Sequence, residues 1–405
     1  MKCRICSTEI TEFMTFGKMP IANGFLEKNQ FEDEYFFELS PAFCDECKTL
    51  QIVEQPEPDR MFHGEYAFFT RTSNSMVAHF GEYARWVQEN YLEDVDQFVV
   101  ELGSNDGAML ENFAKKDIRH LGVEPSGNVA EEARKYGVNS VVDFFGAELA
   151  GKVLEEYGSA DVIMAANVMC HIPDLLSVGE GAAKLLKPKG VLIFEDPYLG
   201  DVIEKTSYDQ LYDEHVYVFS ATSVANIFGR HGFELIDVLP QTTHGGSMRY
   251  VLAKKGQREV SPAVSKQLTH EKNLGLEKLE TYEQFRKNCE RNRDDLVRIL
   301  KEKKAEGARV VGYAATSKST TVLNYCSIGS DLIEYISDTT PIKQGKFCPG
   351  SHILVKAYSK FKENYPDYAV LFAWNHDQEI MANETEYKDA GGKWILFVPE
   401  VSIKS

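Results

Sequence analysis

The stretch DQFVVELGSNDGAML, residues 96–110, decides the fold of this 405-residue chain. Its apolar first half predicts a short strand, and its second half predicts a turn, bracketed by Gly103 and Gly107, that opens a helix. The next strand, in HLGVEPS, ends at Glu124, and a third segment, VVDFF, contains Asp143. A carboxylate at the end of the second strand can accept hydrogen bonds from both ribose hydroxyls of a nucleoside cofactor. We expect Asp143 to meet the adenine edge of the same cofactor.

Strands and helices continue to alternate after this stretch. ADVIMAANVMCHIP (160–173) and GVLIFEDPYLG (190–200) read as strands, with the helix LLSVGEGAAKLLKPKG between them. This alternation predicts an α/β fold with a doubly wound, mainly parallel sheet. Before the stretch, apolar residues at helical spacing predict an amphipathic helix from about Ser75, with one face made of Met76, Phe80, Tyr83, Ala84 and Val87.

A second, smaller α/β unit is expected in the C-terminal part, where ARVVGYAATSKS and YAVLFAWNH each run from a strand into a turn. Residues 255–306 are highly charged at helical spacing, which predicts a solvated amphipathic connector helix. A linker is expected near residues 57–62. The chain therefore divides into three expected domains, residues 1–60, 61–255 and 256–405.

Four of the eight cysteines form two C-x-x-C pairs, Cys3 with Cys6 and Cys44 with Cys47. In a cytosolic chain, such pairs point to a metal rather than to disulfides. Two thiolates from each tight turn complete a tetrahedral Zn²⁺ site. Because four thiolates leave no open coordination position, we expect the zinc to be structural and not catalytic. A redox dithiol is the remaining alternative.

Charge and hydropathy exclude some classes of partner. The formal net charge is -18, and no block of lysine and arginine stands out, which argues against a nucleic-acid partner. A small anionic ligand stays compatible, because one local cationic pocket is enough to bind it. The segment MKCRICSTEI lacks the apolar core of a signal peptide, and no apolar run approaches the length of a membrane span. We therefore expect a cytoplasmic protein without a membrane partner.

The segment ELGSNDG has three interpretations. NAD sites prefer G-x-G-x-x-G, and GSNDGAML lacks the second and third glycines at that spacing. The two glycines alone are also compatible with a plain tight turn. Together with the carboxylate after the second strand, however, the segment resembles the layout of class I S-adenosylmethionine (SAM) methyltransferases, which have a Rossmann-like fold. That resemblance implies SAM contacts at Glu101, Gly103, Asn105, Gly107, Glu124, Asp143 and Asn167.

Read in order, the two cysteine pairs, ELGSNDG, EDPYL, YDEHVYVFS, HGGSMR and GYAATSKSTTVLN resemble the SAM-dependent sugar C-methyltransferases over essentially the whole chain. Members of that family methylate carbon 3 of nucleotide-linked 4-keto-6-deoxy sugars, en route to branched sugars of antibiotics and lipopolysaccharide. The resemblance implies a small N-terminal zinc-binding domain, a central SAM domain and a C-terminal α/β domain that binds the nucleotide-diphosphate sugar. We expect a monomer or a small homo-oligomer.

The resemblance also assigns roles to individual residues. It makes His215 the general base, places Tyr212 and Glu214 beside it, and puts His244 at the sugar end. TSKSTT would cradle the diphosphate, although a hydroxyl-rich helix cap is the plainer interpretation of that segment. The residues expected at the nucleotide sugar are Phe68, His244, Arg249, Tyr313, Lys318, Ser319, Lys343, Asn375 and His376.

One departure from the family pattern lies in YAFFTRTS, where relatives often have Tyr-x-Tyr-His-Ser-Ser. Phe68 takes a place where an active-site tyrosine is often found, and Thr70 replaces a serine. The lost hydroxyl bears on the identity of the sugar more than on the reaction.

Methylation of a carbon beside a ketone needs a base for the α proton and a donor for the developing oxyanion. His215 suits the first task, because imidazole titrates near pH 6.5. We expect Glu214 to raise that pKa or orient the ring, and Tyr212 to donate to the enolate oxygen. The alternatives are a solvated turn at YDEH, a SAM-dependent O- or N-methyltransferase of another small metabolite, and a binding protein with a degenerate SAM fold.

Overall fold

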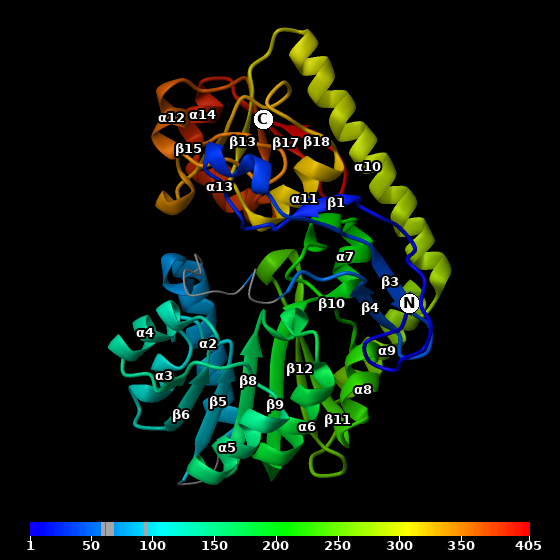
Figure 1. The fold of residues 1–405 in the computed structure, drawn as a ribbon, viewed down its shortest axis with the longest axis vertical. Coiled ribbons are helices and arrows are strands. Elements are labelled where there is room, and N and C mark those ends of the chain that lie inside the picture. The colour runs from blue at the N-terminus through cyan, green and yellow to red at the C-terminus, as the bar shows by residue number, and fades with distance from the viewer. Residues whose placement is uncertain (58–60, 62–68, 93–95) are drawn as a thin grey trace.

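The computed structural model describes residues 1–57, 61, 69–92 and 96–405. Its described strands form sheets of two, three, seven and six strands. Figure 1 shows the seven-stranded sheet in the lower half of the molecule and the six-stranded sheet in the upper half, with the N-terminal strands beside the level where the two halves meet. Within the described part, no helix combines the length and the apolar character needed to cross a bilayer.

The seven-stranded sheet has the order β11-β12-β9-β8-β5-β6-β7. Strands β5 to β9 run parallel, and β12 is antiparallel to both of its neighbours. The expected doubly wound α/β fold is therefore confirmed. The strands are β5 (Phe98–Leu102), β6 (Arg119–Val123), β7 (Ser140–Val141), β8 (Ala160–Ala166), β9 (Leu186–Pro197), β11 (Phe233–Gln241) and β12 (Ser247–Lys254).

The strand order reverses between β5 and β8, and the carboxyl ends of the strands at such a point form the usual ligand site of an open α/β sheet. Every residue of β5 is buried, as expected for a central parallel strand. The amphipathic helix is confirmed as α2, which begins where the Ser73 side chain accepts a hydrogen bond from the Met76 amide. The other helices of this half are α3 (Glu111–Ala114), α4 (Gly127–Lys135), α5 (Ala147–Tyr157), α6 (Leu175–Leu185), α7 (Leu199–Lys205) and α8 (Ala221–Gly229), and α2 spans Asn74–Tyr91.

The six-stranded sheet has the order β15-β14-β13-β16-β17-β18, with β18 alone antiparallel to its neighbour. This arrangement confirms a C-terminal α/β unit. Its strands are β13 (Val310–Tyr313), β14 (Ile336–Asp338), β15 (Val355–Ala357), β16 (Tyr368–Leu371), β17 (Lys393–Leu396) and β18 (Ser402–Lys404). Its helices are α11 (Ser317–Tyr325), α12 (Tyr358–Glu363), α13 (Asp377–Asn383) and α14 (Thr385–Asp389).

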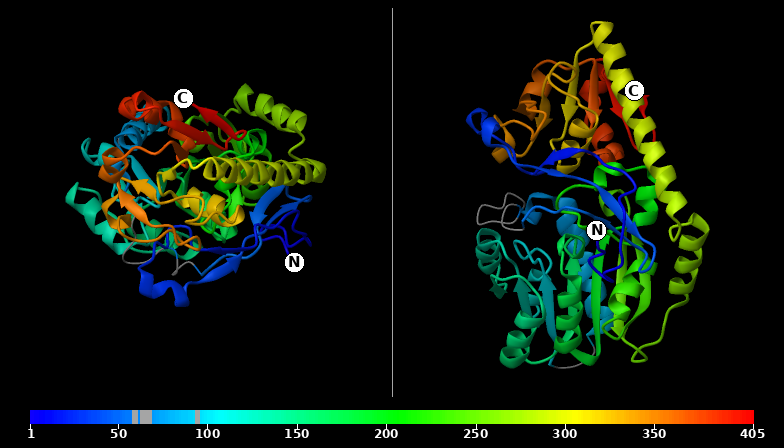
Figure 2. Two further views of the ribbon diagram at one scale, coloured as in Figure 1. Left: turned by 90° about the horizontal axis from the view of Figure 1, so that it is seen from above. Right: turned by 45° about the vertical axis from the view of Figure 1, so that its right-hand side comes forward.

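The connector is a pair of helices, α9 (Pro262–Leu274) and α10 (Leu279–Ala305). Figure 2 shows α10 running along the side of the molecule beside the C-terminal unit. It is less solvated than its charge suggests, because one face is buried and the Asn292 amide donates a 2.6 Å hydrogen bond to the Phe397 carbonyl. Helix α10 therefore packs against the C-terminal unit, whereas α9 contacts α8 and β11 of the seven-stranded half.

The N-terminal segment contributes β1 (Lys18–Pro20) and β2 (Phe36–Glu38), which pair with each other, and β3 (Pro41–Cys44) and β4 (Thr49–Ile52). A third strand, β10 (Tyr217–Val218), pairs antiparallel with β4. This strand comes from the YDEHVYVFS segment, so the N-terminal module and the seven-stranded half share a sheet. Of the expected linker near residues 57–62, residues 58–60 and 62 lie outside the described residues.

Candidate active site

The turn after β5 needs both of its glycines. Gly103 and Gly107 have φ angles of +62° and +75°, a region that L side chains rarely adopt. A Cβ on Gly103 would clash with the Val168 side chain, and a Cβ on Gly107 would lie 2.8 Å from Val138 Cγ2. A side chain at either position would therefore displace the turn.

Glu124 ties this turn to the end of β6. Its Oε2 accepts a hydrogen bond of 2.9 Å from the Asn105 amide, and its Oε1 accepts one of 2.8 Å from the Ser126 amide. Asn105 sits at a φ of +47°, and its Oδ1 accepts from the Thr70 amide at 3.1 Å. Burial raises the pKa of Glu124, while the two amide donors lower it. Each carboxylate oxygen keeps a second lone pair with which to accept from a ribose hydroxyl.

Glu101 fits the cationic end of SAM. It is 4% exposed, and its Oε2 has no hydrogen-bond partner among the described residues. Burial, Asp106 and Glu124 raise the pKa of Glu101 well above its usual range. A buried carboxyl group without a partner is costly unless a ligand satisfies it, and a cationic ligand would restore its charge. Glu101 and the glycine turn thus suit a cofactor with an ammonium and a sulfonium group.

The two other residues expected at the cofactor differ in exposure. Asn167 follows β8 at a φ of +56°, and its amide donates to the Glu195 carbonyl at 2.8 Å, which places it at the carboxyl edge of the sheet. Asp143 lies in the exposed loop after β7 and accepts a hydrogen bond from the Phe144 amide. The side chain of Phe144 is 52% exposed beside it.

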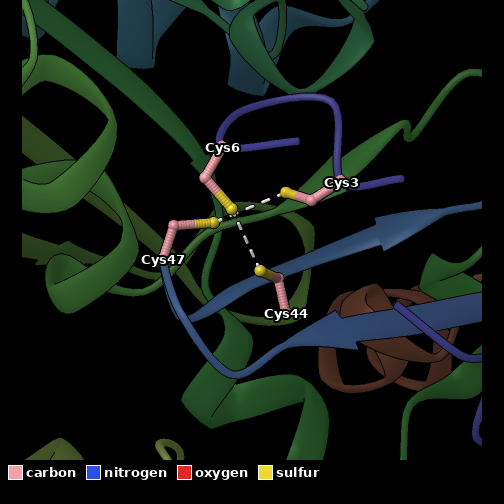
Figure 3. A group of neighbouring side chains, drawn as sticks. All are labelled: Cys3, Cys6, Cys44 and Cys47. Atoms are coloured by element: carbon pink, nitrogen blue, oxygen red, sulfur yellow. Dashed lines mark hydrogen bonds between the residues drawn. The ribbon is translucent and has the colours of Figure 1, made fainter. Parts of the chain in front are cut away.

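The four cysteines of the N-terminal module converge on one point (Figure 3). All four sulfur atoms lie within 4.8 Å of one another, with Cys3 and Cys47 separated by 3.5 Å and Cys6 and Cys44 by 3.4 Å. Tetrahedral thiolates at a Zn–S distance of about 2.3 Å would be about 3.8 Å apart. The donor set and its spacing therefore fit a structural Zn²⁺ ion.

His215 and Tyr212 contact each other directly. The Tyr212 hydroxyl lies 2.8 Å from His215 Nε2, and His215 Nδ1 lies 2.7 Å from the Gln210 carbonyl. A carbonyl only accepts, so the proton of the neutral ring sits on Nδ1 and the lone pair of Nε2 accepts from the tyrosine. His215 is 4% exposed, so YDEH is not a solvated turn.

The expected influence of Glu214 on His215 is corrected by the structure. The Gln210 carbonyl orients the imidazole, whereas Glu214 Oε1 accepts from Asn23 Nδ2 at 2.8 Å. Burial, followed by the nearby His171 and Lys318, lowers the pKa of His215 well below its usual range instead of raising it. The imidazole is therefore neutral at physiological pH, which is the form that can take a proton.

The HGGSMR loop, residues 244–249, contacts Lys318 and the AWNH loop of the C-terminal unit. Lys318 Nζ donates to the His244 carbonyl at 3.2 Å and lies 5.2 Å from the Trp374 ring. Trp374 Nε1 donates to Asp209 Oδ2 at 2.6 Å. Burial lowers the pKa of Lys318, and Asp209 opposes that shift. The buried Nε2 of His244 has no hydrogen-bond partner within the described part of the chain.

Two residues expected at the nucleotide sugar already have hydrogen-bond partners within the protein. Arg249 donates to Glu195 Oε2 through Nε at 3.0 Å and Nη2 at 2.8 Å, and its guanidinium lies 3.6 Å from the Tyr83 ring. Ser319 is 1% exposed and donates to the Thr316 carbonyl at 2.6 Å, so it belongs to the cap of α11. The expectations that Arg249 lies at the nucleotide sugar and that Ser319 faces its diphosphate are therefore corrected, and for Ser319 the helix-cap interpretation holds.

The remaining C-terminal candidates differ in their surroundings. Lys343 Nζ donates to the Ala315 carbonyl at 2.8 Å, close enough to Glu214 for its charge to affect that carboxyl group. Tyr313 donates to Glu384 at 2.7 Å and packs among aromatic rings of the C-terminal core. Asn375 is half-buried and His376 is exposed, both in the short helix that carries Trp374. Phe68 lies outside the described residues.

The structure adds three neighbours that the sequence did not single out as site residues. The His171 ring stacks on the His215 ring at 5.3 Å, Gln210 orients His215, and Asn23 binds Glu214. The position of His171 directly after β8, at the carboxyl edge of the sheet, was the available signal for it. The contact of Asn23 spans 191 residues and had no signal in the sequence.

Acid should destabilise the protein through its buried histidines. Burial lowers the pKa of His171 from 6.5 to about 4 and that of His244 to about 3. Between pH 6.5 and 4 the unfolded chain binds protons that the folded chain does not bind, so the free energy of unfolding falls as the pH falls. At pH 5 the loss is at most about 2 kcal/mol for each histidine.

Thermal unfolding of the wild type and of His171→Asn at pH 7 and pH 5 measures this effect. The variant should lose less stability between the two pH values than the wild type. Equal losses would contradict a neutral, buried His171.

Three family models match consecutive parts of the chain. Residues 3–62 match the family described as "Putative zinc binding domain", residues 77–238 match "Methyltransferase domain", and residues 242–399 match "C-methyltransferase C-terminal domain". The four converging cysteines lie within the first match, and the glycine turn lies within the second.

Relatives match the chain over very different lengths. The C-methyltransferase NovU of Streptomyces niveus is 33% identical over 408 residues, which cover 100% of this chain and 97% of NovU. The ubiquinone biosynthesis O-methyltransferase of Bordetella pertussis is 27% identical over 111 residues, which cover 27% of this chain and 46% of that enzyme. Magnesium protoporphyrin IX methyltransferase of Synechocystis PCC 6803, solved with bound SAM, is 14% identical, with a TM-score of 0.33, over 44% of this chain and 79% of its own.

Proposed function

Because the chain belongs to the C-methyltransferase family that includes NovU, we propose that it methylates carbon 3 of a nucleotide-linked 4-keto-6-deoxy sugar. The protein is a SAM-dependent methyltransferase with a zinc-binding N-terminal module, so it is an enzyme and not a binding protein with a degenerate SAM fold. We further propose that it works in the cytoplasm as a monomer or a small homo-oligomer. Its proposed domains are residues 1–60, 61–255 and 256–405.

The observation that carries the proposal is a neutral, buried base beside cationic groups of a second α/β unit. His215 lies at the carboxyl side of the SAM-domain sheet, and Lys318 of the C-terminal unit is near enough to lower its pKa. Lysine is a point charge suited to a phosphate oxygen. A substrate with an acidic C–H bond at one end and a diphosphate at the other therefore matches the two sides of the site.

The proposed reaction assigns tasks to His215 and Tyr212 of the YDEHVYVFS segment, residues 212–220, which we call the catalytic segment. His215 Nε2 removes the proton from carbon 3, and the electron pair of the broken C–H bond moves into the ketone to form an enolate. Tyr212 holds Nε2 in the structure, and on substrate binding its hydroxyl donates instead to the C-4 oxygen. When bound, SAM supplies a methyl group already activated by the sulfonium charge. The enolate carbon would form its new bond to that methyl group as the S–CH3 bond breaks and its electron pair returns to sulfur, and His215 would later release its proton to solvent.

The position of the new methyl group tests the function. The enzyme is incubated with SAM carrying a ¹³C-labelled methyl group and with TDP-, CDP- and GDP-linked 4-keto-6-deoxy sugars, and carbon–carbon coupling is read by NMR. Label on carbon 3 is the expected result. Label on carbon 5, the other carbon beside the ketone, would keep the enolate chemistry and overturn the position. Label on oxygen or nitrogen would overturn both.

A further inference from the structure

A turn of the N-terminal module enters the active site at the catalytic segment. The turn covers residues 21–24 and is closed by a 3.0 Å hydrogen bond from the Gly24 amide to the Ile21 carbonyl. Ala22 is 1% exposed, so the turn is packed into the protein and not laid on its surface. It follows directly on β1 and lies between the YDEH segment and the start of α11.

The backbone of Ala22 fixes this turn to both neighbours. Its amide donates to Asp213 Oδ1 at 3.1 Å, and its carbonyl accepts from the Thr320 hydroxyl at 2.9 Å. Both hydrogen bonds are buried, and a buried hydrogen bond is costly to break because its partners are left unsatisfied. The turn is therefore held rigidly against the seven-stranded half and against the C-terminal unit.

The side chain of Asn23 contacts the same two segments, YDEH and the start of α11. Its Nδ2 donates to Glu214 Oε1 at 2.8 Å, and its Oδ1 accepts from the Ser317 hydroxyl at 2.9 Å. An ionised carboxylate only accepts and a hydroxyl can donate, so the amide has one orientation that satisfies both partners. One side chain of the N-terminal module thus links a carboxylate next to His215 with the first turn of α11.

The N-terminal module also contacts the catalytic segment on the C-terminal side of His215. The Ile52 amide donates to the Val216 carbonyl at 2.9 Å, and Tyr217 pairs with Gln51 of β4. The Gln51 side chain in turn donates to Cys3 Sγ at 3.1 Å. His215 therefore lies between two contacts with the cysteine-bearing module, one at residues 213–214 and one at residues 216–218.

We propose that Asn23 is a positioning residue of the methyltransferase site, which holds the carboxylate of Glu214, the residue that precedes His215 in the chain, and couples it to the C-terminal unit. This role gives the N-terminal module a part in the reaction. The proposal rests on the proposed function of the catalytic segment. The local electrostatics agree with it. Burial raises the pKa of Glu214, and the Asn23 hydrogen bond and then the Lys343 charge oppose that rise. Removal of the amide donor therefore leaves a carboxyl group that ionises only at higher pH.

Asn23→Asp tests the proposal, because it has nearly the same shape and replaces the donor with a second acceptor. The acid limb of the pH profile of kcat should move upward by about one pH unit or more, with turnover at pH 7 reduced about tenfold and regained at alkaline pH. The KM for SAM should not change. Asn23→Gln keeps the amide and should recover part of the turnover, whereas Asn90→Asp, an exposed change of the same chemistry on α2, should have no effect.

A second readout needs no substrate. The carboxyl carbon of Glu214 is followed by ¹³C NMR in glutamate-labelled protein and assigned by its loss in Glu214→Gln. Its titration should move to higher pH in Asn23→Asp and stay in place in Asn90→Asp. An unmoved titration would overturn the role of Asn23, whether or not turnover falls. If the titration moves but no sugar nucleotide is methylated by the wild type, the positioning role stands and the proposed function fails.

Discussion

Replacement of His215 by asparagine should abolish methyl transfer while SAM binding persists. The change removes the only proposed base, and general base catalysis is worth roughly 10²- to 10⁴-fold in rate, so we expect a loss of about 10³-fold in kcat. An asparagine amide can still donate to the Gln210 carbonyl, which preserves the local packing. Turnover is measured with the methylated sugar nucleotide, and SAM affinity by titration calorimetry.

The matched control is His270→Asn, on the exposed face of α9, which should behave like the wild type. Turnover of His215→Asn close to the wild-type value would overturn the assignment of the base. Loss of both SAM binding and turnover would instead show that the substitution disrupts the fold of the site. Tyr212→Phe in the same series should keep the base and lower kcat, because it removes the donor proposed for the enolate oxygen.

Loss of one cysteine of the zinc centre should cost both the metal and the activity. Apparent zinc affinities of structural sites correspond to about 10–16 kcal/mol, and this energy is coupled to folding of the module. Cys44→Ser removes one of the four converging thiols at the end of β3, next to the strand that pairs with the catalytic segment. We expect the wild type to hold one zinc ion per chain and the variant to hold much less, with turnover lowered more than tenfold.

Metal content by mass spectrometry and turnover of the same samples check this prediction. Cys348→Ala removes a buried cysteine that does not belong to the cluster and should keep the full zinc content. A metal-free wild type that is fully folded and active would contradict the zinc assignment. A zinc-free Cys44→Ser variant with normal turnover would contradict the link between the module and the catalytic segment.

The features that the sequence predicts well are local ones. The strand, the two positive-φ glycines and Glu124 all lie within residues 98–124, so their order and spacing predict the cofactor turn. The spacing of the two C-x-x-C pairs likewise predicts a metal site without any knowledge of the fold. Helix α2 was predictable because its apolar residues recur at the helical period and are buried on one face.

The features that the sequence does not predict depend on contacts between distant segments. The sequence predicts Arg249 at the nucleotide sugar, whereas the pairing of β12 with β9 places Glu195 beside it as its partner. The direction of the His215 pKa shift depends on burial and on His171 and Lys318, which only the folded chain brings near it. The placement of Asn23 on Glu214 joins two segments that only the packed chain brings together.

The role of His215 as the base is tested by the fate of the α protons in deuterated water. Wild-type enzyme is mixed with the sugar nucleotide and S-adenosylhomocysteine, which cannot donate a methyl group, and hydrogen at carbons 3 and 5 is followed by NMR. If His215 is the base, hydrogen at carbon 3 exchanges with the wild type and not with His215→Asn, and the same carbon is fully methylated once SAM is added. Methylation by an enzyme that leaves the carbon 3 hydrogen in place, or exchange that survives in His215→Asn, would contradict that role.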